Sequence, residues 1–385
     1  MGDVGSGGPL TVGMVGAGQL ARMTAPAAIA LGVRLRLLAA SPEDAAALVV
    51  PDVVIGQPGD RDALTRFAAG TDAVTFDHEL VDLELLEELA SAGQAVRPSP
   101  GALLFAVDKR HQRSMLSTFG LPVPAWRPLD PATAAAEVNE LAGEHGWPVV
   151  LKAARGGYDG RGVWAPEGPA AAGRVLATAA ERGTPMLAEA RVPIERELAV
   201  LVARRPGGEA VVWPLVETVQ RDGICVELLV PARVPPDVAT AAEALGRAVA
   251  DVVGAVGVLA VELFLDTDGK LLVNEVATRP HNSGHWTIEG SRTSQFANHL
   301  RAVLDLPLGP TGAVAPAVVT VNVLGGSDGR DPRARLAPAL AEGVEVHLYG
   351  KSPRPGRKLG HVTARGDDLE ETRARARRAA AALSG

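Results

Sequence analysis

A glycine-rich loop follows a short strand that ends in a lysine. Residues 149–152 predict a buried strand ending at Lys152, and four glycines then fall within residues 156–162. Backbone N–H groups of such a loop can contact the oxygens of a polyphosphate, while the ammonium supplies a compact charge. The loop is too long for a two-residue hairpin turn and lacks the strand–GxxxxGKS/T–helix order of a P-loop. The sequence therefore predicts a phosphate-binding loop, with an ordinary glycine-rich turn as the open alternative.

Two glutamates lie on facing strands of a second motif. Two apolar strands flank an Asp-Gly pair at 268–269, which is a strong hairpin signal. A two-residue turn there makes Thr267 face Lys270. The same register places Glu262 opposite Glu275, with Cβ atoms ~5 Å apart. Two such carboxylates repel each other unless a cation lies between them, and Mg²⁺, or Mn²⁺ as an alternative, suits oxygen ligands. A register slip that separates the glutamates is the other reading.

A polar loop without helical or strand periodicity follows this hairpin, at residues 277–286. Arg279, His281 and Asn282 concentrate hydrogen-bond donors directly after the predicted metal-binding strand. Such a loop suits the floor of a substrate site. A turn capped by Asn282 and Ser283 remains the alternative.

Lysine is rare in this chain, which has 38 basic residues. Because lysine and arginine differ in geometry and hydration, the few lysines mark candidate sites. Lys270 lies beside the predicted turn and is expected to be solvated. Prolines hold the basic loop 351–358 extended, which suits an anionic group. The lysines are Lys109, Lys152, Lys270, Lys351 and Lys358.

The composition limits the function classes. A chain of 385 residues with 47% hydrophobic and 22% charged residues predicts two or three globular domains. A net charge of −7 and only 3% aromatic residues argue against a nucleic-acid partner. One cysteine, Cys225, excludes an internal disulfide framework and fits the cytoplasm. Residues 1–9 predict a flexible tail and not a signal peptide, and no apolar run is long enough to span a membrane.

The N-terminal segment predicts a doubly wound sheet. Residues 11–15 form a buried strand, and Gly16-Ala17-Gly18 then opens a helix toward residue 31. This turn resembles a dinucleotide-binding fingerprint, but the second strand, about 34–38, runs to Ser41 without the carboxylate that would hold the ribose of NAD. We therefore expect a simple phosphate at this helix N-terminus. The acidic turn at 77–79 follows a further strand, where such sheets place ligand groups, with an exposed turn carboxylate as the alternative.

The remaining elements also alternate between strand and helix. Strands are predicted at 53–55, 73–76, 95–97, 186–190, 197–204, 211–216, 317–323 and 345–348, and helices at 103–119, 169–182, 235–256 and 294–304. Prolines at 98 and 100 mark a domain boundary. A closing helix with arginines between 373 and 378 is expected to carry a solvated basic face.

Taken together, these motifs resemble the 5-(carboxyamino)imidazole ribonucleotide synthases, which are ATP-grasp ligases of purine biosynthesis. The resemblance covers most of the chain. It rests on Gly16-Ala17-Gly18-Gln19-Leu20, Gly157-Tyr158-Asp159-Gly160-Arg161-Gly162, Asn274-Glu275-Val276-Ala277, the run from Arg279 to Trp286 and the run from Arg354 to His361.

The resemblance implies an α/β (α+β) protein with the ATP-grasp fold. It would comprise a doubly wound, Rossmann-like N-terminal domain at 1–107, an ATP-grasp domain at 108–310 and a small β-rich C-terminal domain at 311–385. The implied reaction consumes ATP, bicarbonate and 5-aminoimidazole ribonucleotide. Bicarbonate attacks the γ-phosphate to give carboxyphosphate, and the exocyclic amine then takes the carboxyl group. The resemblance also suggests a homodimer.

The resemblance further assigns roles to individual residues. The nucleotide would contact Lys109, Lys152, Gly157, Tyr158, Asp159, Gly160, Arg161, Gly162, Glu189, Ala190, Val192, Glu197, Gln220, Asn274 and Glu275, and the metal ion would be held by Glu262 and Glu275. The ribonucleotide would contact Gly18, Gln19, Leu20, Glu79, Lys351 and Arg357. Arg279, His281, Asn282, Tyr158 and Asp159 would act in catalysis, with the first three binding bicarbonate or carboxyphosphate.

Two departures and two alternatives accompany this assignment. The turn Asp77-His78-Glu79-Leu80 differs from the acidic-aromatic-acidic-Asn turn common in the family, so only Glu79 is carried over. Gln220 stands where many members have histidine. Another ATP-grasp ligase, such as a formate-dependent ribonucleotide transformylase or a biotin carboxylase, is one alternative. A non-catalytic nucleotide-binding protein of the same fold is the other.

Overall fold

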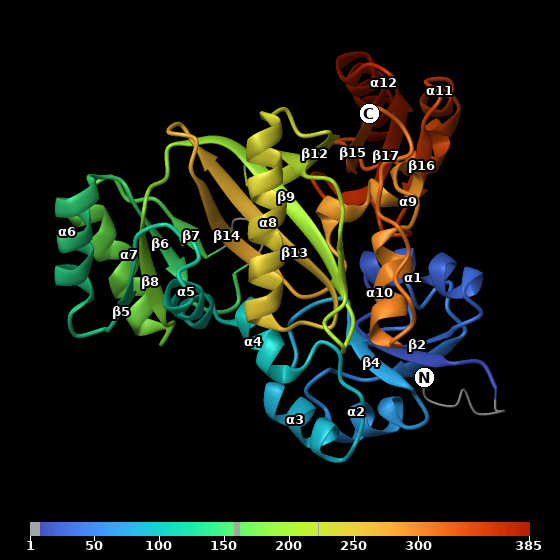
Figure 1. The fold of residues 1–385 in the computed structure, drawn as a ribbon, viewed down its shortest axis with the longest axis horizontal. Coiled ribbons are helices and arrows are strands. Elements are labelled where there is room, and N and C mark those ends of the chain that lie inside the picture. Colours follow the sequence, from blue (N-terminus) through green and yellow to red (C-terminus); the bar gives the residue numbers. More distant parts are fainter. Residues whose placement is uncertain (1–7, 158–161, 222) are drawn as a thin grey trace.

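The computed structural model describes residues 8–157, 162–221 and 223–385, and the expected N-terminal tail therefore lies largely outside it. The described residues form three sheets (Figure 1). Within the described ranges no helix is both long and apolar enough to cross a membrane.

The N-terminal segment forms a parallel four-stranded sheet, as predicted. Its order is β3-β2-β1-β4, from Thr11–Val15 (β1), Arg34–Ala39 (β2), Asp52–Ile55 (β3) and Ala73–Phe76 (β4). The predicted strand at 95–97 is reduced to one parallel bridge between Val74 and Val96. Helices Gln19–Ala30 (α1), Arg61–Ala68 (α2) and Leu83–Ser91 (α3) connect the strands, and Asp60 and Asp82 cap the last two.

The predicted helix at 103–119 is wrong, because the chain forms two helices there. Pro100–Val107 (α4) ends at Asp108, whose backbone is extended, and Lys109–Thr118 (α5) begins directly after it. The Asp108 carboxylate accepts hydrogen bonds from the N–H groups of Arg110 and His111. This cap reorients the chain so that Lys109 starts a new helix.

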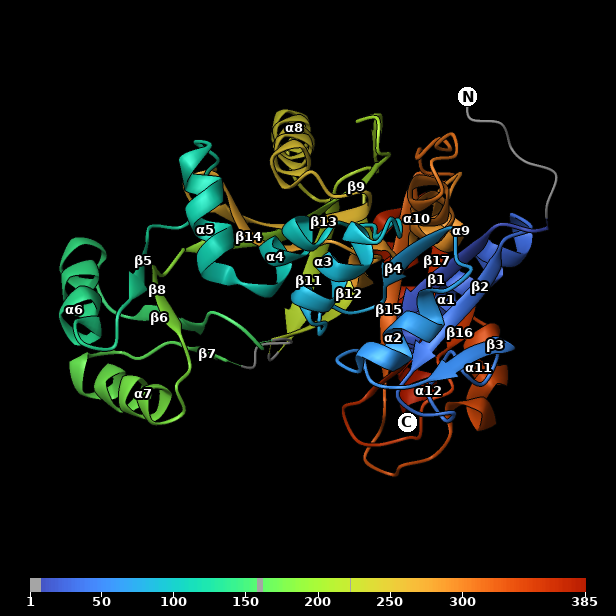
Figure 2. The ribbon, with the colours of Figure 1, turned by 90° about the horizontal axis from the view of Figure 1, so that it is seen from below.

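A small lobe carries the glycine-rich loop. Its antiparallel sheet has the order β5-β8-β6-β7, from Trp126–Leu129 (β5), Val149–Ala153 (β6), Val163–Trp164 (β7) and Met186–Ala190 (β8). Helices Ala134–His145 (α6) and Pro169–Glu181 (α7) pack on it through a separate apolar core. This lobe stands apart from the N- and C-terminal segments (Figure 2).

The largest sheet has nine strands and continues past residue 310 into the C-terminal segment. Its order is β14-β13-β9-β11-β12-β15-β17-β16, with β10 added to β9. The strands are Ile194–Arg204 (β9), Ala210–Val212 (β10), Val216–Arg221 (β11), Ile224–Val230 (β12), Gly257–Asp266 (β13), Leu271–Ala277 (β14), Ala317–Leu324 (β15), Glu345–Leu348 (β16) and Lys358–Gly366 (β17). The predicted single strand at 211–216 is wrong, because it is divided between β10 and β11.

Helices cover this sheet and join it to the N-terminal segment. Pro236–Val253 (α8) packs on β9, where a Cβ on Gly246 would lie 2.4 Å from the Val200 side chain. Gln295–Val303 (α10) lies between α1 and β13. The shorter helices are Asn282–Gly284 (η1), Thr287–Gly290 (α9), Pro332–Arg335 (η2) and Leu336–Leu340 (α11), and Leu369–Ser384 (α12) closes the chain.

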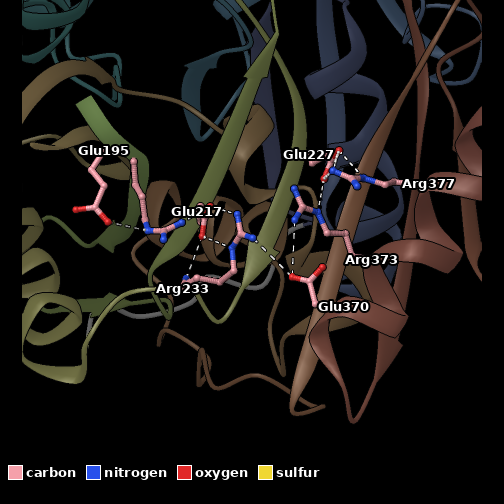
Figure 3. Close-up of polar contacts among 8 residues, drawn as sticks. Glu195, Glu217, Glu227, Arg233, Glu370, Arg373 and Arg377 are labelled. Carbon is pink, nitrogen blue, oxygen red and sulfur yellow. Dashed lines mark hydrogen bonds and ion pairs between the residues drawn. The ribbon is translucent and has the colours of Figure 1, made fainter. Parts of the chain in front are cut away.

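The closing helix α12 is only in part the solvated basic face that was expected, because Arg377 and Arg378 are exposed but Arg373 is largely covered. Glu227 on β12 is buried, and its carboxylate lies 2.8 Å from both Arg373 and Arg377 (Figure 3). The ion pairs join this helix to the sheet strand beneath it. The spacing of arginines along a helix does not reveal that a buried glutamate of another element lies against one face of that helix.

A second buried acid extends this network toward the small lobe. Glu217 on β11 pairs with Arg233 at 2.5 Å and with Arg196 at 3.3 Å. Glu370 of α12 lies 3.6 Å from Arg233 and 3.8 Å from Arg373, so it connects the two clusters (Figure 3). The C-terminal segment is therefore attached to the large sheet by charge as well as by backbone pairing.

Candidate functional site

Glu262 and Glu275 face each other across β13 and β14, as predicted, but the turn between them was predicted wrongly. The loop has three residues, since Asp266 N–H donates to Lys270 O at 3.0 Å. Nearer the site, Leu263 pairs with Val273 and Glu262 pairs with Glu275, so Asn274 is an extra residue on β14. The three-residue loop and this bulge offset each other and restore the expected pair.

The glutamate pair is an electrostatically strained arrangement. Burial, and then the neighbouring Glu275, raise the pKa of Glu262 to about 7. Burial alone would raise the pKa of Glu275, but Lys109 holds it below its usual value. The Lys109 ammonium donates to Glu275 Oε1 at 2.5 Å. Two close carboxylate groups fit a hard divalent cation.

The described part of the chain holds no cluster of three or more His, Cys, Asp or Glu side chains suited to a metal. An ion at Glu262 and Glu275 would therefore complete its shell with phosphate oxygens and water, as Mg²⁺ commonly does.

Lys152 and Glu189 form a buried pair at the base of the small lobe. Lys152 Nζ lies 2.8 Å from Glu189 Oε2 and donates to Asn274 Oδ1 at 3.2 Å. Arg113 Nε donates to Glu189 Oε1 at 2.8 Å. Burial would raise the pKa of Glu189, but Arg113 and Lys152 hold it below its usual value. The bulge at Asn274 thus meets the strand-end lysine.

Sequence reasoning missed Arg113, which joins this cluster from α5. Its guanidinium also donates to the carbonyl of Asn274 at 2.6 Å. Arg113 lies four residues after Lys109, so both side chains fall on one face of the helix. That spacing was the signal that could have found it.

The glycine-rich loop is only partly described. Gly157 precedes, and Gly162 follows, the predicted residues Tyr158, Asp159, Gly160 and Arg161, which lie outside the described ranges. Gly162 has φ +77° and its carbonyl accepts from Ala153 N–H at 2.8 Å. A side chain is strained in this conformation, which accounts for glycine there.

The other predicted nucleotide residues lie on, or in the link between, strands β8, β9 and β11. Ala190 ends β8, Val192 lies in the link to β9, and Glu197 pairs with Phe264 of β13 and Thr218 of β11. Burial raises the pKa of Glu197. Gln220 is half-buried on β11.

Arg279 of the polar loop contacts the N-terminal segment. Arg279 Nε lies 2.8 Å from Glu79 Oε2, so a residue predicted for the anion touches one predicted for the ribonucleotide. Burial would lower the pKa of Arg279, but Glu79 holds it above its usual value. The guanidinium of Arg279 therefore stays protonated.

His281 and Asn282 lie beside Arg279 in the same loop. His281 Nδ1 is 2.9 Å from Ser283 Oγ, and its Nε2 is 3.5 Å from Glu262 Oε1. Burial is the main cause that lowers the pKa of His281 well below its usual value, so the ring is neutral. Asn282 Oδ1 accepts from Gln19 Nε2 at 2.7 Å.

Gln19 is shared between the polar loop and the C-terminal loop. Its Oε1 accepts from Lys351 Nζ at 2.6 Å, while its amide nitrogen holds Asn282. Gln19 and Leu20 begin α1 directly after Gly18. Arg357 is exposed and donates to Ser352 O at 3.1 Å. Across the described ranges no contact brings Arg357 against the other predicted residues.

The first glycine turn does not offer an open phosphate site. Gly18 N–H donates to the buried Asp77 carboxylate at 2.5 Å, and a Cβ on Gly16 would lie 1.9 Å from that carboxylate. An acid of the chain itself thus takes the helix N-terminal donor that we expected a phosphate to use. Burial is the main cause that raises the pKa of Asp77.

Lys358, which the sequence marked only as one of the sparse lysines in the basic loop 351–358, also acts on the polar loop at 277–286. Its charge contributes, after burial, to the lowered pKa values of His281 and His285. The rarity of lysine was a signal for it, but the basic loop alone did not separate Lys358 from its neighbours.

Family comparisons divide the chain into three matched regions. A ribonucleotide synthetase preATP-grasp domain matches residues 10–107, an ATP-grasp domain matches 114–296, and a phosphoribosylaminoimidazole carboxylase C-terminal domain matches 318–375. The order agrees with the fold expected from the sequence.

Relatives and solved structures extend over almost the whole chain. N5-carboxyaminoimidazole ribonucleotide synthases from Mycobacterium tuberculosis and Corynebacterium ammoniagenes are 52% and 46% identical, covering 97% and 96% of this chain and 87% and 91% of the relatives. The synthase from Aspergillus clavatus in complex with ADP and 5-aminoimidazole ribonucleotide has a TM-score of 0.88 at 32% identity, covering 97% of this chain and 98% of that chain. The Thermus thermophilus synthetase has a TM-score of 0.86 at 37% identity, covering 97% and 99%.

Proposed function

This chain belongs to the N5-carboxyaminoimidazole ribonucleotide synthases, and we propose that the junction around Glu262 and Glu275 is its active site. It is an ATP-grasp ligase of purine biosynthesis that carboxylates 5-aminoimidazole ribonucleotide at the expense of ATP. A formate-dependent transformylase or a biotin carboxylase is not favoured, because relatives over most of the chain are synthases.

One observation supports this placement above the others. The facing pair Glu262 and Glu275 lies between the phosphate-side lysine, Lys109, and the predicted anion residue His281. Phosphoryl transfer needs positioning and charge neutralisation more than a protein nucleophile. An arrangement of this kind supplies both.

We assign the two carboxylates to Mg²⁺, with Mn²⁺ as the alternative. The ion, when bound, neutralises charge on the nucleotide phosphates. Lys109 and Lys152 contact the phosphates, together with the glycine-rich loop. Glu189 and the residues around β8 and β9 hold the adenosine. When the nucleotide enters, Lys109 exchanges the Glu275 carboxylate for a phosphate group. The lysine therefore keeps a negatively charged partner.

The first step takes place beside Arg279, His281 and Asn282. A bicarbonate oxygen attacks the γ-phosphorus, the bond to the bridging oxygen breaks, and ADP leaves. Arg279 can hold the planar anion through two parallel hydrogen bonds. The neutral His281 ring can form a hydrogen bond to this anion without itself becoming protonated.

The second step joins the amine to the carboxyl carbon. The exocyclic nitrogen attacks that carbon, the C–O bond to phosphate breaks, and phosphate leaves while the nitrogen loses a proton. Gln19, Glu79 and Lys351 position the ribonucleotide for this attack, with Leu20 and Arg357 as further contacts. Gln19 touches both Lys351 and Asn282, so it can align the two reactants.

The experiment that tests this function measures phosphate release from ATP and bicarbonate, with and without 5-aminoimidazole ribonucleotide. We expect release to depend on the ribonucleotide. Release that instead depends on formate or biotin would support a different ligase, and ATP binding without turnover would support a non-catalytic protein. We also infer a cytoplasmic homodimer, for which sedimentation of the purified chain at twice its monomer mass is the check.

A further inference from the structure

Three histidine rings stack, with one tyrosine ring tilted against them, where the polar loop meets the C-terminal strands. His361 on β17 lies between His285 and His347, with ring centroids 4.5 Å and 4.8 Å away and planes within about 25° of parallel. Tyr349, just after β16, has its hydroxyl 2.7 Å from His361 Nδ1. His285, Tyr349 and His361 are fully buried. We call these four residues the ring stack.

One side of the ring stack is continuous with the loop that carries Asn282. His285 follows η1, and its backbone N–H donates to Asn282 O at 3.1 Å. Glu289, on the helix that follows, lies 2.6 Å from His347 Nε2. The loop is therefore fixed against the C-terminal strands at two points, through His285 and through Glu289.

The other side of the ring stack supports the predicted ribonucleotide lysine. Lys351 Nζ lies 5.4 Å from the centroid of the Tyr349 ring, a distance at which the ring face attracts a cation. The same ammonium donates to Gln19. A shift of the Tyr349 ring would therefore move Lys351 away from Gln19.

The ring stack is not explained by hydrogen bonding alone. In the described part of the chain, both nitrogens of His285 and Nε2 of His361 are buried without a hydrogen-bond partner. Burial lowers the pKa of His285 to about 3 and that of His361 well below its usual value, so these rings are neutral and can stack without repulsion. Buried polar atoms without partners call for a reason other than stability.

We propose that the ring stack is a positioning unit that sets Lys351 at a fixed place relative to the loop carrying His281 and Asn282. The proposal rests on the proposed function, because these two places hold the ribonucleotide and the carboxyphosphate. If Lys351 and this loop move relative to each other, the amine of the ribonucleotide no longer lies next to carboxyphosphate, and water takes its place. Water then attacks it and bicarbonate and phosphate form, so ATP is consumed without carboxylation.

The test compares two variants, each of which removes a buried hydroxyl group that contacts a histidine ring. Tyr349→Phe removes the hydroxyl that holds the ring beneath Lys351 against His361, so the ring can shift and displace Lys351. Thr75→Val is the matched control, because Thr75 Oγ1 lies 2.8 Å from Nε2 of the equally buried His299, which is outside the site. Both variants leave one ring nitrogen without its partner.

The measured quantity is phosphate released per ribonucleotide carboxylated, together with KM for the ribonucleotide and the unfolding temperature. We expect about a tenfold rise in this ratio for Tyr349→Phe, because a displacement on the order of 1 Å can cost ~100-fold in rate. Thr75→Val should lose thermal stability to a similar extent and keep the wild-type ratio. Equal ratios in the two variants would overturn the proposal. Ribonucleotide-dependent release by the wild-type chain, measured first, tests the proposed function separately.

His285 provides a second comparison that does not depend on Tyr349→Phe folding well. His285→Phe keeps a flat ring in the stack without its polar atoms, and we expect the wild-type ratio. His285→Ala removes the ring, and we expect the ratio to rise. If His285→Phe raises the ratio as much as His285→Ala, the ring nitrogens are required and the positioning role is wrong.

Discussion

Glu262 and Glu275 are direct cross-strand partners even though the turn that joins their strands is one residue longer than the Asp-Gly signal predicts. The bulge at Asn274 adds one residue to β14 and shifts the strand register by one, so that Glu262 and Glu275 are again directly opposite each other. It also allows the Asn274 side chain to meet Lys152. The strand irregularity therefore serves the site.

The first prediction concerns this pair. We expect Glu275→Gln and Glu262→Gln each to lower turnover at least ~100-fold while the chain stays folded, because one charge of the proposed metal site is lost. Steady-state turnover across a Mg²⁺ titration, with circular dichroism, is the measurement. Asp268→Asn, on the exposed tip of the same hairpin, should keep wild-type turnover. Normal Mg²⁺-dependent turnover in both glutamine variants would refute the metal assignment.

Lys152→Arg tests whether a compact ammonium is needed. Lys152 is buried between Glu189 and Asn274, where a planar guanidinium cannot take the same place. We expect ATP turnover to fall by about tenfold or more, given the cost of overfilling a buried site. Lys270→Arg, whose side chain is 71% exposed, should be silent. Equal losses in the two variants would contradict this account of the sparse lysines.

Arg279→Lys separates the anion pocket from the nucleotide pocket. Losing one charge-assisted hydrogen bond should cost ~1.5–3 kcal/mol, or roughly one to two powers of ten in rate. We expect a higher bicarbonate requirement and an ATP affinity, measured without bicarbonate, that is nearly unchanged. If ATP binding collapses while the bicarbonate dependence stays the same, Arg279 belongs to the nucleotide site.

The closing helix gives a prediction about stability. Arg373→Ala leaves the buried Glu227 with Arg377 alone, and we expect a loss of about 3 kcal/mol in the free energy of unfolding. Arg378→Ala breaks a pair whose arginine is 58% exposed and should cost much less, because solvent screens an exposed ion pair. Urea unfolding of both variants provides the comparison. A loss for Arg373→Ala no larger than that for Arg378→Ala would show that the network is not stabilising.

Local patterns predicted much of the fold. The parallel N-terminal sheet follows from short buried strands that alternate with helices, and the glutamate pair follows from strand alternation. The three-residue loop and the Asn274 bulge were not predicted, because an Asp-Gly pair fits several hairpin turns. Asp108 was read within one long helix, although aspartate is also a strong cap.

The contacts between distant segments could not be predicted in the same way. Arg113 meets Glu189 and Asn274 only because three elements converge, and Asp77 takes the Gly18 N–H only because β4 lies beside β1. Arg373 was assigned to solvent because nothing in α12 indicates the acid on β12. Each of these contacts depends on the packing of separate elements, which periodicity does not encode.

The central claim is that ATP drives the carboxylation of a ribonucleotide amine through phosphorylated bicarbonate. Turnover with ¹⁸O-labelled bicarbonate, ATP and 5-aminoimidazole ribonucleotide tests it most directly, with the isotope content of the released phosphate measured by mass spectrometry. The account predicts that the phosphate carries one bicarbonate oxygen and that release falls when the ribonucleotide is omitted. Unlabelled phosphate, or release that is indifferent to the ribonucleotide, would contradict it.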